Sequence, residues 1–131
     1  MFEWNIAMTT GVPDVDDQHR ELINKFNELV EAEASGADRE KIGSILDFLQ
    51  YYAEWHFSTE EQIMDKYHCH ILEENKKAHN EYRVRFGKLY EQWQNMTDSD
   101  TAILRDTIVE LARWIVYHTL TVDNQLHKYV K

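Results

Sequence analysis

Residues 72–93 read LEENKKAHNEYRVRFGKLYEQW, and this stretch decides the fold class. Residues that suit a protein interior recur in it at alternating steps of three and four, which is the spacing of one face of an α-helix. This face consists of Leu72, Asn75, His79, Tyr82, Phe86, Leu89 and Trp93. Asn75 and His79 interrupt a stripe that is otherwise apolar or aromatic. We therefore expect this helix to carry a functional site as well as part of the core.

Three further segments carry apolar stripes with the same helical period. Together they predict an N-terminal arm and four helices, at about residues 1–13, 14–34, 39–67, 71–95 and 99–128. The connections are short, roughly four to eight residues, and short connections favour antiparallel neighbours. The chain is therefore predicted to be an all-α, up-down-up-down four-helix bundle that forms one domain over residues 1–131.

Polar residues near the predicted helix starts indicate capping side chains. Asp14 or Asp16 is expected to cap the first helix, and Asp98 or Ser99 the last one. The aromatic residues of the arm are expected to pack across the bundle.

The composition limits the classes of function. Asp and Glu outnumber Lys and Arg by 24 to 14, and the formal charge of −10 argues against binding nucleic acid or an anionic membrane. The single cysteine, Cys69, has no partner for an internal disulfide. The first ten residues are too short and too polar for a signal peptide or a membrane span. We therefore expect a cytoplasmic protein with no nucleic-acid or membrane partner.

Five titratable residues stand on the inward stripes of the predicted helices, and a sixth, Asp123, follows the last stripe closely. They are His19, His56, Glu60, His79, His118 and Asp123. Imidazole and carboxylate groups are costly to bury unless they are hydrogen-bonded, paired or bound to a metal. One such histidine is readily explained as a hydrogen-bonded core residue, but four on four helices, together with two carboxylates, favour a metal site. The set exceeds the needs of one tetrahedral zinc and suits two ions of higher coordination, bridged by the carboxylates.

The spacing of these residues sets geometric requirements. His56 and Glu60 are four positions apart, about 40° around a helix, and share a face. His118 and Asp123 are five positions apart, about 140° on an ideal helix, and do not. If both serve one site, the helix must unwind locally between them or contain a π-bulge.

The remaining histidines are not candidate metal ligands, and several common metal-binding and catalytic motifs are absent from the sequence. His68, His70 and His127 are expected to be solvated, without a metal role. The chain contains no Glu-x-x-His pair, no His-Glu-x-x-His motif, no glycine-rich phosphate loop and no Gly-x-Ser-x-Gly motif.

Taken together, these residues resemble the single-domain bacterial hemerythrins over nearly the whole chain. The resemblance rests on the Trp4 arm, the run from Gly11 to His19, His56-Phe57 followed by Glu60-Glu61 and Met64, the stretch Lys76 to His79, and Trp114 to His118 followed by Asp123. It implies two non-haem iron ions (Fe²⁺/Fe³⁺), bridged by an oxo or hydroxo group, that bind O2 reversibly.

The resemblance also implies a role for each site residue. His19 and His56 would hold the iron that keeps an open coordination position, and His79 and His118 would hold the other. Glu60 and Asp123 would bridge the two ions. The residues matching the apolar lining of the O2 pocket are Leu22, Phe57, Trp114 and Ile115.

The chain departs from the family pattern at two positions. Asn75 stands where the family has a third histidine on the second iron, and it could coordinate through its carbonyl oxygen, hydrogen-bond a water, or leave that iron five-coordinate. Thr119 stands where the pocket usually has an aliphatic residue. Our hypothesis is that its hydroxyl hydrogen-bonds O2 or water, which makes the pocket wetter and autoxidation faster.

The resulting prediction is a non-enzymatic protein that binds O2 for storage, delivery or sensing, with an unidentified protein partner receiving the O2. One alternative is a di-iron oxidase, peroxidase or NO-handling enzyme. Another is a metal-binding bundle whose site is incomplete because of Asn75.

Overall fold

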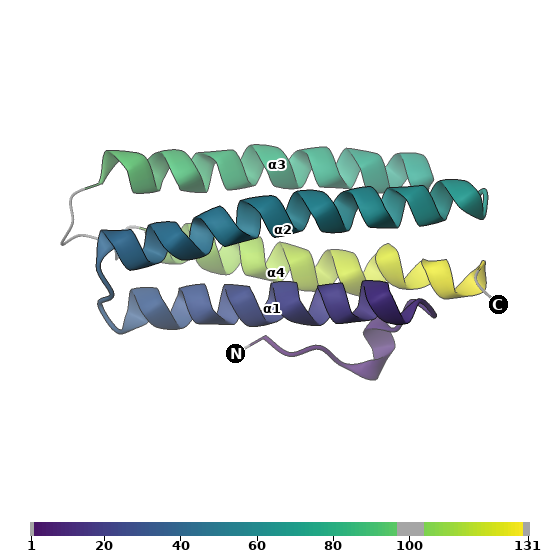
Figure 1. Cartoon of the computed structure of the whole chain (residues 1–131), viewed down its shortest axis with the longest axis horizontal. Helices are drawn as coiled ribbons and strands as arrows, with labels where there is room; N and C mark the ends of the chain where they lie inside the picture. The colour runs from purple at the N-terminus through teal and green to yellow at the C-terminus, as the bar shows by residue number, and fades with distance from the viewer. Residues whose placement is uncertain (1, 97–103, 130–131) are drawn as a thin grey trace.

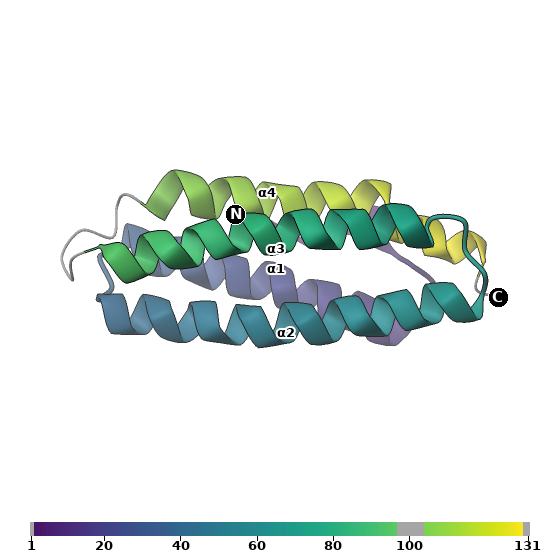
Figure 2. The same cartoon turned by 90° about the horizontal axis from the view of Figure 1, so that it is seen from above.

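The computed structural model describes residues 2–96 and 104–129. The elements run in the order η1 (Ile6–Met8), α1 (Pro13–Ala34), α2 (Arg39–Lys66), α3 (Leu72–Asn95), α4 (Arg105–Thr121) and η3 (Asp123–Lys128). The four long helices run alternately up and down along one axis (Figure 1). Both α1 and α3 pack against α2 and α4, and the view from above shows the same arrangement (Figure 2). The predicted all-α, up-down-up-down four-helix bundle is confirmed.

The first helix begins differently from the prediction. Pro13 occupies its first turn, where a missing N–H costs nothing, and Val12 precedes it without a side-chain cap. Asp16 is buried, and its Oδ1 accepts hydrogen bonds of 2.9 Å from both the backbone N–H and the hydroxyl of Thr10. The carboxylate proposed as a cap therefore joins the arm to α1. The predicted cap at 98–99 lies outside the described residues.

The last predicted helix, 99–128, is not continuous. The α-helix ends at Thr121, its C-cap Val122 has φ −112° and ψ −61°, and Asp123 opens the 3₁₀ segment η3. A 3₁₀ segment turns through more degrees per residue than an α-helix, so this change re-aims the side chain of Asp123. The α-helix is thus interrupted between His118 and Asp123, but by a tighter 3₁₀ segment and not by the local unwinding or the π-bulge expected from the five-residue spacing.

The helical stripes bury two apolar clusters along the bundle. The larger one contains side chains from all four helices that are at most 2% exposed, among them Phe26, Leu46, Leu89 and Ile108. Each such side chain contributes about 1.5–3 kcal/mol of burial free energy. The smaller cluster consists of Met64, Cys69, Ile71 and Leu126.

The candidate site lies between these clusters along the helices. On α2, Glu60 falls between Phe57 of the larger cluster and Met64 of the smaller one. A polar centre is thus enclosed by apolar side chains on both sides.

The arm packs on the bundle as expected. The backbone N–H of Phe2 donates to Asn27 Oδ1 at 3.0 Å, and the guanidinium of Arg20 lies 4.1 Å from the ring centre of Trp4. Phe2 and Trp4 are partly buried against the larger cluster, whereas Ile6 is 85% exposed. Within the described ranges, no helix combines the length and apolar character needed to cross a membrane.

Candidate metal centre

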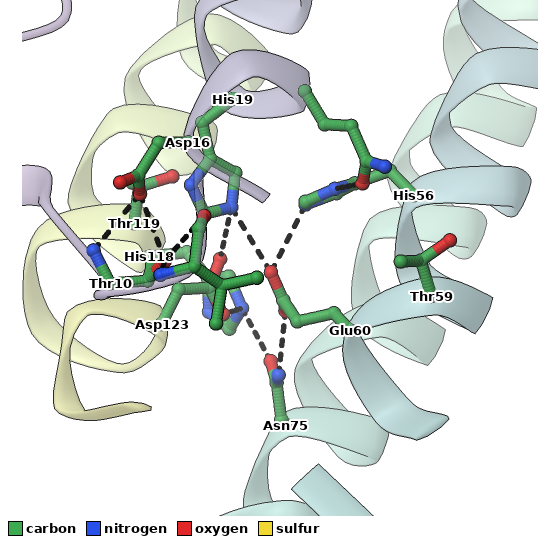
Figure 3. A network of polar contacts seen from close by, with 12 residues as sticks. Thr10, Asp16, His19, His56, Thr59, Glu60, Asn75, His118, Thr119 and Asp123 are labelled. Atoms are coloured by element: carbon green, nitrogen blue, oxygen red, sulfur yellow. Dashed lines mark hydrogen bonds and ion pairs between the residues drawn. The ribbon is translucent and has the colours of Figure 1, made fainter. Parts of the chain in front are cut away.

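Seven buried polar side chains converge inside the bundle from α1, α2, α3, α4 and η3. They are His19, His56, Glu60, Asn75, His79, His118 and Asp123, each at most 5% exposed. Figure 3 shows six of them, all but His79, turned toward one another. The structure therefore brings together the six candidate ligands and Asn75.

One group of ligand atoms forms around His19 and His56. The Nε2 of His19 lies 3.0 Å from Glu60 Oε2 and 3.1 Å from Asp123 Oδ2. The Nε2 of His56 lies 3.1 Å from the same Oε2 of Glu60. These four residues offer atoms that all lie within 4.8 Å of one another, which suits a single cation.

A second group forms around His79 and His118 and uses the other oxygen of each carboxylate. The Nε2 of His79 lies 3.2 Å from Glu60 Oε1, and the Nε2 of His118 lies 3.0 Å from Asp123 Oδ1. Glu60 and Asp123 thus belong to both groups, with one oxygen in each. Two cations sharing two carboxylates would match this arrangement.

The hydrogen bond at Nδ1 of His79, the ring nitrogen that faces away from the site, determines whether Nε2 has a lone pair for a cation. His79 Nδ1 lies 2.7 Å from Glu61 Oε2, and a carboxylate only accepts, so Nδ1 must donate its proton. In neutral His79, Nε2 then carries a lone pair, and it faces the oxygen of Glu60. Two electron-rich atoms at this distance repel each other unless a proton or a cation lies between them.

Two further observations support a cation. His56 Nδ1 lies 2.7 Å from Gln18 Oε1, and burial lowers the pKa of His56 although Glu60 opposes the shift, so its neutral form is favoured. Asp123 Oδ1 is buried and accepts no hydrogen bond, despite its 3.0 Å distance from His118 Nε2. An unpaired carboxylate oxygen beside an imidazole nitrogen is expected at a metal site.

Without a cation, the site binds a proton strongly. Burial lowers the pKa of His19, but its hydrogen bonds to Asp123 and Glu60 outweigh this effect and raise the pKa to about 10. Burial would also raise the pKa of Glu60, yet His56, His19 and His79 hold it well below its ordinary value. The Glu60 carboxylate therefore stays ionised and requires a positive charge beside it.

A comparison with known families identifies this arrangement. A family model described as the hemerythrin HHE cation binding domain matches residues 10–130. The chain belongs to the hemerythrin family. The bacteriohemerythrin of Aquifex aeolicus (strain VF5) is 27% identical over 120 residues, covering 92% of this chain and 90% of that protein. The bacteriohemerythrin of Clostridium acetobutylicum is 28% identical over 128 residues, covering 95% and 98%.

Solved structures agree with this membership. A crystal structure of wild-type hemerythrin matches with a TM-score of 0.85 at 26% identity, covering 99% of this chain and 98% of that one. The resemblance inferred from the sequence is confirmed, and the chain is a metal-binding four-helix bundle of the hemerythrin type.

Two of the pocket residues suggested by the hemerythrin resemblance stack on histidines of the second group. The ring of Phe57 lies 3.9 Å from that of His79 with an interplanar angle of 14°, and Trp114 lies 4.8 Å from His118 at 9°. Phe57 also contacts His56, with ring centres 5.8 Å apart. These rings restrict rotation of the imidazoles and cover them against water.

The remaining pocket residues lie in the interior. Leu22 is 1% exposed, Ile115 4% and Thr119 1%. The hydroxyl of Thr119 donates to the backbone oxygen of Ile115 at 2.9 Å. Its proton is therefore already used, and Thr119 can only accept a hydrogen bond from water. The hypothesis that Thr119 hydrogen-bonds O2 or water stays a prediction, and this geometry assigns the hydroxyl oxygen the accepting role.

Sequence reasoning missed the two side chains that orient the histidines. Gln18 immediately precedes His19 and Glu61 immediately follows Glu60 in the chain, and neither was predicted to contact a histidine. The available signal was their adjacency to His19 and Glu60, since metal-binding histidines usually donate the N–H of their other ring nitrogen to a nearby acceptor. His68, His70 and His127 are exposed, as expected.

Proposed function

We propose that this chain holds two iron ions at the centre and binds O2 reversibly there, for storage, delivery or sensing. The observation that carries the proposal is the sharing of Glu60 and Asp123, each of which gives one oxygen to each of two buried groups. Membership of the hemerythrin family favours iron as the metal. The family relatives named bacteriohemerythrin support the same reading.

In this proposal the ligands divide between the two ions. His19 and His56 hold one, His79 and His118 hold the other, and the two carboxylates bridge them. The iron pair, when bound, supplies the electrons that hold O2 reversibly. Every other part of the task falls to the surrounding side chains.

The surrounding residues orient the ligands and exclude water. Gln18 and Glu61 bind the outer nitrogens of His56 and His79 at 2.7 Å, which directs their inner nitrogens toward the metal positions. Apolar side chains such as Leu22 and Ile115 give bound O2 a dry environment. Dry surroundings disfavour the release of O2 as a charged, reduced species, because such a species gains most from hydration.

We propose further that the chain acts without turnover. The hydroxyl of Thr119 supports this, since its proton is donated to Ile115 O and is not available to protonate a reduced oxygen species. The alternative is a di-iron enzyme that consumes peroxide or NO. Asn75 favours that alternative, because an amide is a weaker donor than imidazole and leaves the second ion more open to a substrate.

The test is reconstitution with Fe²⁺ under anaerobic conditions, followed by exposure to O2. We expect two irons per chain and a visible charge-transfer absorption that appears with O2 and disappears when O2 is removed. Loss of this behaviour in His56→Ala, with retention in the exposed-site control His70→Ala, would locate it at the centre. Two bound irons without a reversible absorption would contradict the proposal, and sustained consumption of peroxide would favour the enzyme.

A further inference from the structure

The two ends of the Asn75 side chain face different kinds of atom. Its Nδ2 donates to Glu60 Oε1 at 2.7 Å and to Met64 Sδ at 3.1 Å. A carboxylate and a thioether only accept hydrogen bonds, so the NH₂ end must point toward them. The amide oxygen therefore faces the other way, 2.6 Å from the Nε2 of His118. The orientation of the amide follows from its neighbours.

This orientation places the oxygen of Asn75 at the second group of ligand atoms. Leaving Asn75 aside, the two groups have the same donors, namely two imidazoles and one oxygen from each shared carboxylate. The second group has the amide oxygen of Asn75 beside these donors, since Asn75 Oδ1 lies 2.6 Å from His118 Nε2.

A cation at the second position would change the partner of this oxygen. In the absence of metal, the N–H of His118 at Nε2 can donate to Asn75 Oδ1. When Nε2 binds a cation it carries no proton, because the same lone pair forms the bond to the metal. The oxygen of Asn75, which is 0% exposed, then loses its donor. A buried acceptor left in this state costs about 1–3 kcal/mol, unless it binds the cation as well.

We propose that the amide oxygen of Asn75 is a fifth protein ligand of the second cation, and that it shifts the metal preference of this position. The inference rests on the two-cation centre proposed above. Imidazole suits zinc, whereas carbonyl and carboxylate oxygens suit manganese. The second position thus favours Mn²⁺ over Zn²⁺ more than it would with a histidine at position 75.

The experiment is a titration of the full chain, stripped of metal by a chelator, with Mn²⁺ and then with Zn²⁺ as competitor. Bound and free Mn²⁺ are distinguished by electron paramagnetic resonance. The variants are Asn75→Leu and Asn75→His, and the matched control is Asn80→Leu, which changes an exposed asparagine of the same helix.

We expect wild type and the Asn80 control to bind two Mn²⁺ per chain with magnetic coupling between them. Asn75→Leu should bind the second Mn²⁺ at least about ten-fold more weakly, since even loss of a residue that only orients a metal ligand typically costs about 10–100-fold in affinity. Asn75→His should make Zn²⁺ displace the second Mn²⁺ at a concentration lower by about ten-fold. Circular dichroism establishes that each variant is helical.

Wild-type affinity for both cations in Asn75→Leu would overturn the proposal, as would an unchanged Zn²⁺ competition in Asn75→His. If Asn75→Leu does not fold, the comparison of wild type with Asn75→His still decides, since pulsed resonance counts the imidazole nitrogens on Mn²⁺. An added nitrogen in Asn75→His supports the proposal, and an equal count overturns it. The titration uses no O2, so failure to bind O2 would affect only the proposed function.

Discussion

Replacement of Glu61 provides a direct test of how the outer nitrogen of His79 controls the metal centre. Glu61 Oε2 lies 2.7 Å from His79 Nδ1 and fixes the proton there. Glu61→Gln preserves the shape of the side chain and an acceptor oxygen but removes the negative charge. Glu61→Leu removes the acceptor as well and leaves the Nδ1 proton of a buried ring without a partner.

The expected magnitude follows from the position of Glu61. Loss of a residue that hydrogen-bonds a metal-binding histidine typically costs about 10–100-fold in metal affinity. This corresponds to about 1.4–2.7 kcal/mol. The Glu61 side chain is 23% exposed, so its charge is partly screened by water. We therefore expect about ten-fold weaker binding of the second cation in Glu61→Gln and up to about 100-fold in Glu61→Leu.

The group of ligands around His19 and His56 provides the control for the Glu61 variants. Gln18 Oε1 lies 2.7 Å from His56 Nδ1, so Gln18→Leu should weaken the first cation instead. Anaerobic titration with Co²⁺, followed by absorption and calorimetry, yields the two affinities. Because Glu60 serves both cations, some coupling is expected, and the decisive quantity is the ratio of the two affinities. The reasoning is refuted if Glu61→Gln and Gln18→Leu change both affinities by equal factors.

Three further predictions concern the packing of the helices, the protonation of His19 and the pocket. Gly43→Ala would place a methyl group 2.2 Å from Trp93 and should lower the free energy of unfolding by about 1–3 kcal/mol, measured by chemical denaturation. Gly87→Ala, whose added carbon meets nothing within 4 Å, should raise it by about 0.5–1 kcal/mol, and equal effects would contradict the predicted clash. In chelator-treated protein, folding raises the pKa of His19 to about 10. Protonated His19 therefore stabilises the folded state fully below about pH 6.5, and this contribution is lost as the pH rises toward 10. The thermal midpoint should fall over this range and His19→Gln should flatten the fall; a level midpoint in wild type would contradict the shift. Thr119→Ile should slow autoxidation of the iron-loaded protein about two- to ten-fold, the factor that corresponds to the free energy of one hydrogen bond to water. The rate is followed by absorption after exposure to O2, and an unchanged rate would show that the hydroxyl retains no water.

The sequence was sufficient for the bundle because its helical stripes are long and regular. The stripe of 72–93 predicts a helix that the structure places at Leu72–Asn95. Helix ends were less predictable, since they depend on competing hydrogen bonds. Asp16 could cap α1 by local rules, but Thr10 of the arm provides two donors in the folded chain. A contact of this kind depends on the tertiary structure and has no local pattern.

The candidate site was predictable to the extent that polar residues interrupted apolar stripes. His56 and Glu60 stand out because a buried helix face rarely carries them. Glu61 is next to Glu60 and lies about 100° away around the helix, so its position resembles that of a solvated residue. Its role depends on the orientation of His79 on another helix. The direction of the Asn75 amide likewise required the positions of atoms from two other helices.

The position of Asp123 in η3 affects the lifetime of the folded state. Neither group of ligands is complete without Asp123, and η3 packs against η1, with Asn124 Nδ2 donating to Ala7 O across 117 positions of sequence. Contacts that close such long loops carry a large entropic cost. A folding transition state that lacks them gains nothing from a cation, whereas the native state gains the whole binding energy. Bound metal should therefore slow unfolding while leaving the folding rate nearly unchanged, so that the centre sets how long the two ends of the chain stay together.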